Sequence, residues 1–163
     1  ELFQYGKSRP PQIKSDIARR WQWIAIHECV MQVSFLREQM DIIRGRLVKT
    51  SPLVHRHLDK AALRSSFKLF DEYFPDYREI RHAIAHSGEV SLNPERHSAD
   101  GSIYAITKIS SIDRLELEYK GRSLTMDITR ATLTKIEAVV STFWDAFAPA
   151  ARELEASDPQ GAE

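Results

Sequence analysis

The sequence predicts a mainly helical protein, an up-and-down helical bundle that carries a small antiparallel β insertion before its last helix. Long segments with apolar residues at helical spacing predict the bundle. A later segment, residues 101–128, switches to apolar residues at every second position, which is typical of strands. At 163 residues with 42% hydrophobic content, the chain fits a single domain around one core.

Charge, cysteine content and the length of the apolar runs exclude several classes of protein. Lys and Arg total 23 and Asp and Glu total 23, so the chain lacks the global positive charge of broad nucleic-acid binders, and any RNA contact must come from a local patch. Cys29 is the only cysteine, which excludes an intrachain disulfide framework. The apolar runs are short and no signal pattern is seen, so we expect a cytoplasmic protein without a membrane partner.

The first expected helix covers residues 15–47, after an irregular lead-in at 1–14. Ser15 is its expected N-cap. Its apolar residues form a wide stripe, which predicts packing against two or more neighbours. The stripe consists of Ile17, Trp21, Ile24, Val30, Met31, Phe35, Leu36, Ile42 and Ile43.

A second helix is expected from Pro52 to Tyr73, with proline at the first helical position, where its missing N–H costs nothing. Phe74-Pro75-Asp76 interrupts the pattern, because a residue before proline disfavours helical torsions and Asp76 can cap a new helix. The next helix is therefore short, residues 76–87, and Gly88 is its expected stop.

A polar loop is expected at 91–102, followed by two or three antiparallel strands at 103–109, 115–119 and 124–128. Lys120-Gly121 is a plausible tight hairpin turn. Thr129 is the expected cap of the last helix, 129–156, and residues 157–163 form a small, polar tail expected to be disordered. The last helix has an apolar stripe of Leu133, Ile136, Val140, Phe143, Trp144 and Phe147.

The helix at 76–87 carries the most informative pattern, Tyr77-Arg-Glu-Ile-Arg-His-Ala-Ile-Ala-His86-Ser-Gly88. Arg81 precedes His86 by five residues, an apolar residue stands before the arginine, a polar one follows it, and small residues end the motif. This order resembles the Arg-x4-His signature of the HEPN superfamily, helical domains that often act as metal-independent ribonucleases. The resemblance covers residues 15–88 and the last helix, with the strands outside the core pattern.

The resemblance implies a HEPN-like endoribonuclease, a toxin or phage-defence effector that cleaves RNA without metal or cofactor. It also implies a homodimer with a composite site, and an antitoxin or other regulatory protein as a further partner. Two positions depart from the family. His82 replaces the common asparagine or aspartate, and Gly88 stands where some toxins carry a tyrosine that a partner enzyme modifies.

A helical projection at about 100° per residue separates two faces of the 76–87 helix. Tyr77, Ile80 and Ile84 form the expected core face. The opposite face carries Arg78, Arg81, His82, Ala85 and His86. Arg81 and His86 lie about 140° and about 7.5 Å of rise apart, so one helix does not bring their tips together. A second copy across a two-fold axis at Ala85 would gather both groups.

The candidate catalytic residues are Arg81, His86 and His82, with Arg78 as a substrate-binding residue. Cleavage of RNA without metal needs a base for the 2′-hydroxyl, an acid for the leaving oxygen, and positive charge on the transition state. His86 suits the acid/base role because histidine titrates near neutral pH, and Arg81 suits the phosphate clamp. His82 is an orienting group or second proton carrier.

Three alternatives stay open. One is a non-catalytic HEPN-like module that binds a protein or nucleotide partner. His82 and His86 are four residues apart, a spacing that also suits zinc, although no glutamate follows His82. His55, Arg56 and His57 either extend a basic RNA-binding surface or form a solvated face. Trp21, Trp23 and Trp144 are expected in the core.

Overall fold

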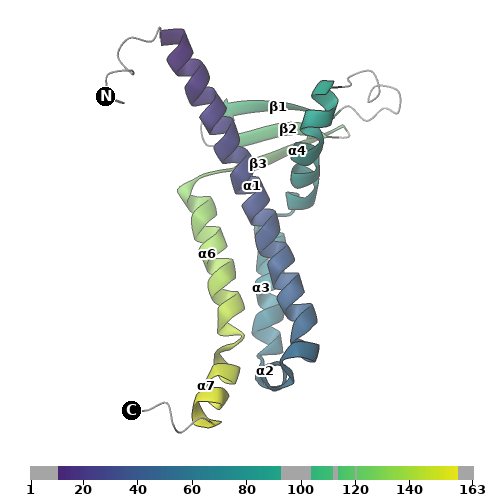
Figure 1. Cartoon of the computed structure of the whole chain (residues 1–163), viewed down its shortest axis with the longest axis vertical. Helices are drawn as coiled ribbons and strands as arrows, with labels where there is room; N and C mark the ends of the chain where they lie inside the picture. The colour runs from purple at the N-terminus through teal and green to yellow at the C-terminus, as the bar shows by residue number, and fades with distance from the viewer. Residues whose placement is uncertain (1–10, 93–103, 112–113, 120, 158–163) are drawn as a thin grey trace. The chain divides into compact units, whose positions relative to one another are not determined.

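The computed structural model describes residues 11–92, 104–111, 114–119 and 121–157 of the chain. Most of them are helical, and a three-stranded antiparallel sheet precedes the last two helices, which confirms the predicted fold class. The elements in chain order are α1 (Pro11–Thr50), α2 (Pro52–His57), α3 (Lys60–Tyr73), α4 (Tyr77–Leu92), β1 (Tyr104–Ser111), β2 (Arg114–Tyr119), β3 (Arg122–Asp127), α6 (Arg130–Asp145) and α7 (Ala148–Ser157) (Figure 1).

The elements form two compact units that interleave along the sequence. Unit 1 comprises residues 1–31 and 79–128, and unit 2 comprises residues 32–78 and 129–163. Both α1 and α4 run from one unit into the other. Each unit is described by itself below.

Helix α1 begins at Pro11, four residues before the predicted cap at Ser15, so the prediction of an irregular lead-in was wrong for residues 11–14. Pro11 occupies the first helical position, which proline tolerates because its missing N–H would have no helical partner there. The rest of the predicted lead-in, residues 1–10, lies outside the described residues.

The buried face of α1 differs from the predicted stripe. The buried apolar side chains are Ile26, Val30, Val33, Met40 and Leu47. Trp21 is 67% exposed, and Phe35 and Ile42 are each 41% exposed, so their assignment to the core was wrong. The helix has two apolar stripes, and periodicity alone does not say which of them meets the other helices.

The sheet of unit 1 has the strand order β1-β2-β3, with both neighbouring pairs antiparallel. Its second hairpin pairs Tyr119 with Arg122, and Gly121 in the turn has a φ of 71°, a conformation that favours glycine. This confirms the predicted turn at Lys120-Gly121. The buried side chains of β2 and β3 alternate along each strand, as expected for one covered face: Leu115, Leu117, Tyr119, Leu124 and Met126.

The predicted helix at 52–73 is two helices in unit 2, so the single-helix prediction was wrong. Leu58 adopts an extended conformation after α2, and Asp59 then caps α3. The Asp59 carboxylate accepts hydrogen bonds from the backbone N–H groups of Ala61 and Ala62, at 2.8 and 2.9 Å. An aspartate at the N-cap satisfies donors that have no partner inside the helix, which makes the new start favourable.

The predicted helix at 129–156 also divides, into α6 and α7. Thr129 caps α6 as predicted, with its side chain accepting from the backbone N–H of Thr132. Pro149 lies at the second position of α7 and cannot donate a helical hydrogen bond, which explains why α6 ends near Asp145. At the break, the Ala146 carbonyl accepts a hydrogen bond of 2.9 Å from the Asp59 N–H, so the two helix breaks of unit 2 meet.

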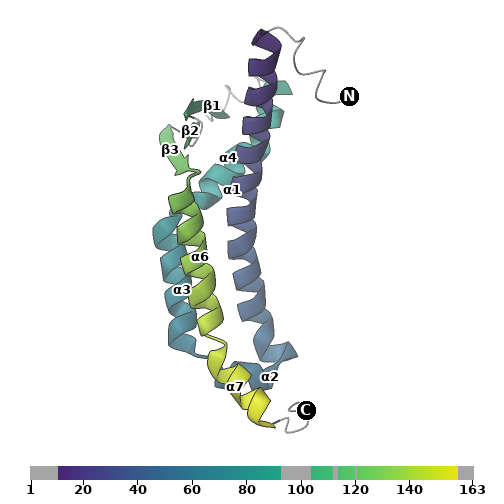
Figure 2. The same ribbon diagram turned by 90° about the vertical axis from the view of Figure 1, so that its left-hand side faces the viewer.

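Helices α3 and α6 lie side by side and build the core of unit 2 (Figures 1 and 2). Phe67 of α3 meets Phe143 of α6 at a ring-centroid distance of 6.4 Å, and Phe70 is fully buried. Trp144 follows Phe143 but is 60% exposed, so its predicted core position was wrong. Position 144 lies about 100° around the helix from 143, which takes its side chain off the face that meets α3.

Candidate functional site

Helix α4, which carries the Arg-x4-His pattern, runs from Tyr77 to Leu92 and passes through Gly88. The predicted stop at Gly88 and the start of a loop at Ser91 were therefore wrong. A glycine inside a helix costs only about 1 kcal/mol, so α4 can continue through Gly88. The next proline is Pro94, and a residue before proline disfavours helical torsions, so the helix ends before it. The remainder of the predicted loop, residues 93–102, lies outside the described residues.

The part of α4 in unit 1 has a sharply divided surface. Ile80, Ala83 and Ile84 are buried, with exposed fractions of 3%, 0% and 5%. His82 and Ala85 are exposed on the other side. The predicted core positions of Ile80 and Ile84 are confirmed, whereas Tyr77, at the start of the helix in unit 2, is only half-buried.

Arg81 lies at the border between these two faces. Its side chain is half-buried, and its Nε atom is buried. A long basic side chain can cover apolar surface with its stem while its charged end reaches solvent. The stem of Arg81 is therefore held by the fold, which restricts where the guanidinium can lie. We refer to Arg81, His82 and Ala85 as the α4 strip.

The imidazole of His82 contacts the sheet of unit 1. Its ring meets the ring of Tyr119 on β2 in an edge-to-face arrangement, with the centroids 5.8 Å apart and the planes at 72°. Tyr119 is only 5% exposed and is thus fixed in the core. Such pairs have a preferred geometry, so Tyr119 restricts the orientation of the His82 ring.

Tyr119 was missed as a site residue because sequence reasoning placed the strands outside the core pattern. The signal was the position of a tyrosine at the end of the alternating strand pattern, directly before the Lys120-Gly121 turn. Nothing in that local pattern shows that the strand meets the motif helix, which is a contact between distant parts of the sequence.

His86, the predicted acid/base residue, has a helical backbone within α4, but its side chain lies outside the described ones. Ideal helix geometry separates this position from Arg81 by about 140° and about 7.5 Å of rise.

Arg78, the predicted substrate-binding residue, belongs to unit 2 and is exposed. Its Nε donates a hydrogen bond of 2.7 Å to the Tyr77 hydroxyl, and its guanidinium lies 5.4 Å from the centre of that ring. The hydrogen bond to Tyr77, followed by the nearby carboxylates of Asp71 and Asp41, raises the pKa of Arg78. Like any arginine, Arg78 carries a positive charge at physiological pH.

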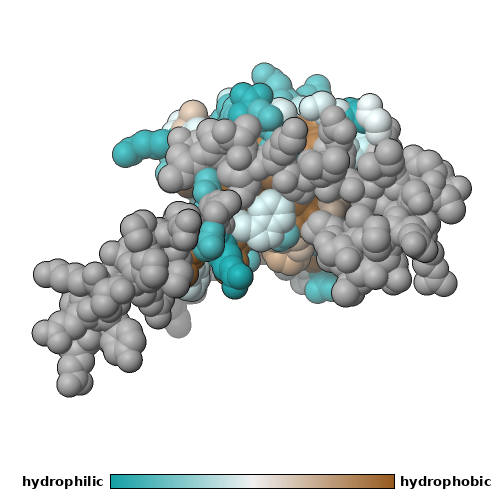
Figure 3. Space-filling model, turned by 90° about the horizontal axis from the view of Figure 1, so that it is seen from above, coloured by the Kyte–Doolittle hydropathy of each residue, from teal (hydrophilic) through white to brown (hydrophobic). Residues whose placement is uncertain are grey.

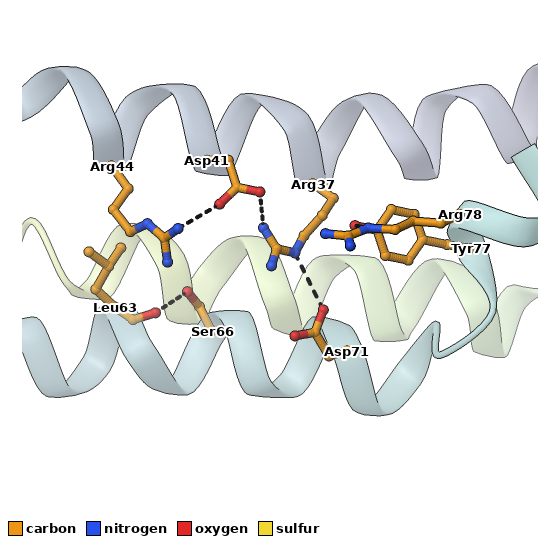
Figure 4. A network of polar contacts seen from close by, with 8 residues as sticks. All are labelled: Arg37, Asp41, Arg44, Leu63, Ser66, Asp71, Tyr77 and Arg78. Atoms are coloured by element: carbon orange, nitrogen blue, oxygen red, sulfur yellow. Dashed lines mark hydrogen bonds and ion pairs between the residues drawn. The ribbon is translucent and has the colours of Figure 1, made fainter.

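An ion cluster around the buried side chain of Arg37 in unit 2 was not predicted from the sequence. Arg37 of α1 is 8% exposed, and it binds Asp41 one turn further along the helix and Asp71 of α3 (Figure 4). The guanidinium also lies 4.5 Å from the centre of the Phe67 ring. Figure 4 shows Tyr77 and Arg78 beside this cluster. Arginine suits such a place because its planar group can pair with carboxylates and stack on aromatic faces at once.

A shallow hollow of about 540 Å³ lies on the α1 part of unit 1, and Asp16, Arg20, Trp23 and Ile24 line it. In Figure 3, the view from above, the described residues are mostly hydrophilic (teal) or intermediate (white), with smaller apolar patches (brown) between them. His27 lies one turn beyond, with its ring 4.2 Å from the ring of Trp23. Burial lowers the pKa of His27, and its buried Nε2 has no hydrogen-bond partner among the described residues.

The described residues contain no group of three or more His, Cys, Asp or Glu side chains that could hold a metal ion. The His86 side chain lies outside the described residues, so a zinc site at His82 and His86 stays a prediction. In the described ranges no helix combines the length and the apolar character that crossing a bilayer requires.

Comparison with models of protein families, with curated proteins and with solved structures finds no match to this chain. The resemblance to the HEPN superfamily therefore rests on the motif and its local order.

Proposed function

We propose that this chain is a HEPN-like, metal-independent endoribonuclease that acts in the cytoplasm as a toxin or phage-defence effector. The observation that supports the proposal most is the division of α4, in which Ile80, Ala83 and Ile84 are buried while His82 and Ala85 are exposed. Arg81 thus borders, and His82 lies on, a surface that RNA can reach. Because the overall charge of the chain is neutral, the basic side chains of the α4 pattern provide the main attraction for phosphate.

The proposed reaction is an attack of the ribose 2′-oxygen on the adjacent phosphorus. One imidazole takes the proton of the 2′-hydroxyl, and a second protonates the departing 5′-oxygen, so that the products are a 2′,3′-cyclic phosphate and a 5′-hydroxyl. Arg81 stabilises the added negative charge on the phosphate oxygens, and Arg78 binds the chain further along. His86 and His82 supply the imidazoles.

The composite site requires two copies of the chain. Because one helix separates Arg81 from His86, the site draws its groups from two α4 helices that meet at Ala85, whose small side chain permits a close approach. An antitoxin or other regulatory protein would act by covering this surface.

Cleavage of RNA in the presence of a chelator tests the proposal. We expect purified protein to degrade a mixed RNA and to leave 2′,3′-cyclic phosphate ends, whereas an Arg81→Ala/His86→Ala variant loses at least about 100-fold in rate, as for loss of general acid–base catalysis. The matched control is Arg152→Ala on α7, which removes an exposed arginine outside the α4 pattern and should retain activity. Circular dichroism must show that both variants are folded.

Equal RNA decay by wild type and the α4 variant would contradict catalysis. The half-burial of Arg81 favours a second candidate, a non-catalytic module that binds a protein or nucleotide partner, because a held arginine stem also suits a structural role. Fluorescence anisotropy with labelled RNA separates the two. Binding without cleavage, weakened by Arg78→Ala, would support the second candidate.

A further inference from the structure

The corner between α1 and α2 in unit 2 is a positively charged segment of a chain whose total charge is zero. Residues 42–58 contain four Lys and Arg residues and no Asp or Glu. Ser51 is the only residue between the two helices. Its N–H donates a hydrogen bond of 3.0 Å to the Leu47 carbonyl, and its carbonyl accepts one of 3.0 Å from the His55 N–H. These bonds hold α2 against the last turn of α1, at the end of unit 2 (Figure 2).

Three cations of this corner have no counter-ion in the described parts of the chain. Arg46, Lys49 and Arg56 are exposed, and no described carboxylate lies within ion-pair distance of them. Arg44 differs from them, because it pairs with Asp41 at 2.9 Å. The three cations are therefore available to a partner that carries negative charge.

Two aliphatic side chains are exposed at the same corner. Val48 is 55% exposed and Leu53 is 45% exposed. No residue of α2 is buried, and Leu47 is the only buried residue between positions 44 and 50. Leu53 and Arg56 are three residues apart in α2, a spacing that places side chains next to each other on a helix surface. Apolar and cationic side chains thus share this surface.

This combination of side chains favours an anionic lipid surface as the partner. Lys and Arg are attracted to anionic headgroups, and exposed aliphatic side chains can enter the boundary between headgroups and acyl chains. Single-stranded RNA could use the same cations, but its bases usually stack on aromatic rings. Residues 36–66 contain no Phe, Trp or Tyr, so this corner offers RNA no such ring.

We propose that the α1–α2 corner, defined by Arg46, Val48, Lys49, Leu53 and Arg56, docks on the surface of a bilayer that contains anionic lipids. Its three cations bind the headgroups, and its two aliphatic side chains enter the headgroup region. The sequence predicted no membrane partner because it lacks a long apolar run and a signal pattern, but docking at the surface requires neither. The proposal uses none of the α4 residues, so it is independent of the proposed ribonuclease reaction.

The docking is expected to be reversible. Helix α7 contacts α2 and carries Glu153 and Glu155, which are both exposed. Their negative charge opposes part of the attraction of the three cations for anionic lipid. Salt screens interactions between exposed charges, so the remaining attraction should weaken as the ionic strength rises.

Sedimentation of the full chain with lipid vesicles tests the proposal. Vesicles of phosphatidylcholine alone are compared with vesicles of phosphatidylcholine and phosphatidylserine in equal parts. We expect at least about tenfold tighter binding to the anionic vesicles, and a loss of this binding as salt is added. Equal binding to both kinds of vesicle, or binding to neither, would overturn the proposal.

Alanine substitution tests the position of the surface. Lys49→Ala/Arg56→Ala should lose about tenfold in affinity for the anionic vesicles. The matched control, Arg130→Ala/Lys135→Ala, removes two exposed cations of α6 in the same unit and should bind as the wild type does. Circular dichroism must show that both variants are folded. An equal loss in the two variants would contradict docking through the corner.

A fluorescent label tests whether Leu53 enters the lipid. In a Cys29→Ser background, which removes the exposed native thiol, Leu53→Cys carries an environment-sensitive dye. Its emission should move to shorter wavelengths on anionic vesicles, whereas the same dye on Ser141→Cys, at an exposed position of α6, should not respond. An unchanged emission at position 53 would overturn the proposal. RNA binding through Lys49 and Arg56 without vesicle binding would also overturn it, in favour of an RNA surface.

Discussion

In unit 2, the guanidinium of Arg37 is enclosed by Asp41, Asp71 and the face of Phe67, and the whole residue is only 8% exposed. In unit 1, His82 is exposed and its ring meets the ring of Tyr119, which restricts its orientation. The first arrangement uses a charged group to join two helices, and the second holds a titratable group at a surface. A basic residue on an amphipathic helix can thus join two helices or be held at a surface. Which of these two roles it has depends on its neighbours.

Removal of Arg37 tests whether its ion cluster is structural, and this change should have the largest effect on stability. We expect Arg37→Ala to lower the free energy of unfolding by about 2 kcal/mol, because the buried side chain packs on Phe67 and joins α1 to α3 through Asp71, whereas Asp41 keeps its ion pair with Arg44. Urea denaturation followed by circular dichroism measures the change. Arg37→Met is the control, since it keeps an apolar stem and should lose less. A loss below about 0.5 kcal/mol for alanine would show that the cluster is not a structural one.

A smaller effect is expected at the joint of unit 2, where Asp59 caps α3. Asp59→Ala should cost about 1 kcal/mol, because the N–H groups of Ala61 and Ala62 lose their acceptor. Asp59→Asn retains an acceptor oxygen and should stay within a few tenths of a kcal/mol of wild type. Thermal unfolding of both variants checks the prediction, and equal destabilisation would mean that the negative charge matters more than the cap.

The pH dependence of unfolding tests His27 in unit 1. Burial lowers the pKa of His27 in the folded protein, so the unfolded chain binds this proton more readily. Stability from this residue is complete above the unfolded pKa, about 6.5, and is lost as the pH falls below it. His27→Gln should flatten the fall in unfolding free energy between about pH 7 and pH 5. An unchanged slope in urea titrations would contradict this assignment.

The smallest change in stability is expected at the α4 strip itself. His82→Ala removes one exposed ring from the edge of Tyr119 and should change the free energy of unfolding by about 0.5 kcal/mol or less. The same variant should slow RNA cleavage if the proposed function is right. Arg37→Met should leave cleavage unchanged. The two variants together therefore distinguish His82, a surface group of the proposed site, from Arg37, a structural group. A loss above about 2 kcal/mol would place His82 among the structural residues.

The parts of the fold that the sequence predicted are those with local causes. The turn at Lys120-Gly121 follows from the positive φ that glycine accepts, and the start of α6 follows from the hydroxyl of Thr129. The burial of Ile80 and Ile84 follows from helical periodicity.

The breaks between α2 and α3 and between α6 and α7 also have local causes in the sequence, although the apolar periodicity continues across both. Asp59 is a strong N-cap residue inside the predicted 52–73 helix, and Pro149 interrupts the predicted 129–156 helix. Giving these residues more weight than the continuing apolar pattern would have divided both helices correctly.

Other features depend on contacts between distant parts of the chain. Helix α1 has two apolar stripes, and the choice between them depends on where α3 and the other helices pack. The prediction therefore placed Phe35 and Ile42 in the core, where the structure buries Val33 and Met40. In the same way, the two faces of α4 could be predicted in part, whereas the contact of His82 with Tyr119 could not, because it joins a helix to a strand more than 30 residues away.

The interleaving of the two units also sets the order in which they can be completed during synthesis. Unit 1 has all its strands once β3 has been made, but α3 must wait for α6, which begins 57 residues after α3 ends. At the usual speed of translation, about 5–20 residues per second, this delay is roughly 3–11 s. For that time Phe67 of the nascent chain lacks Phe143, the α6 ring that it meets in the finished protein. The newly made first half of unit 2 is therefore the part of this chain that we expect chaperones to bind.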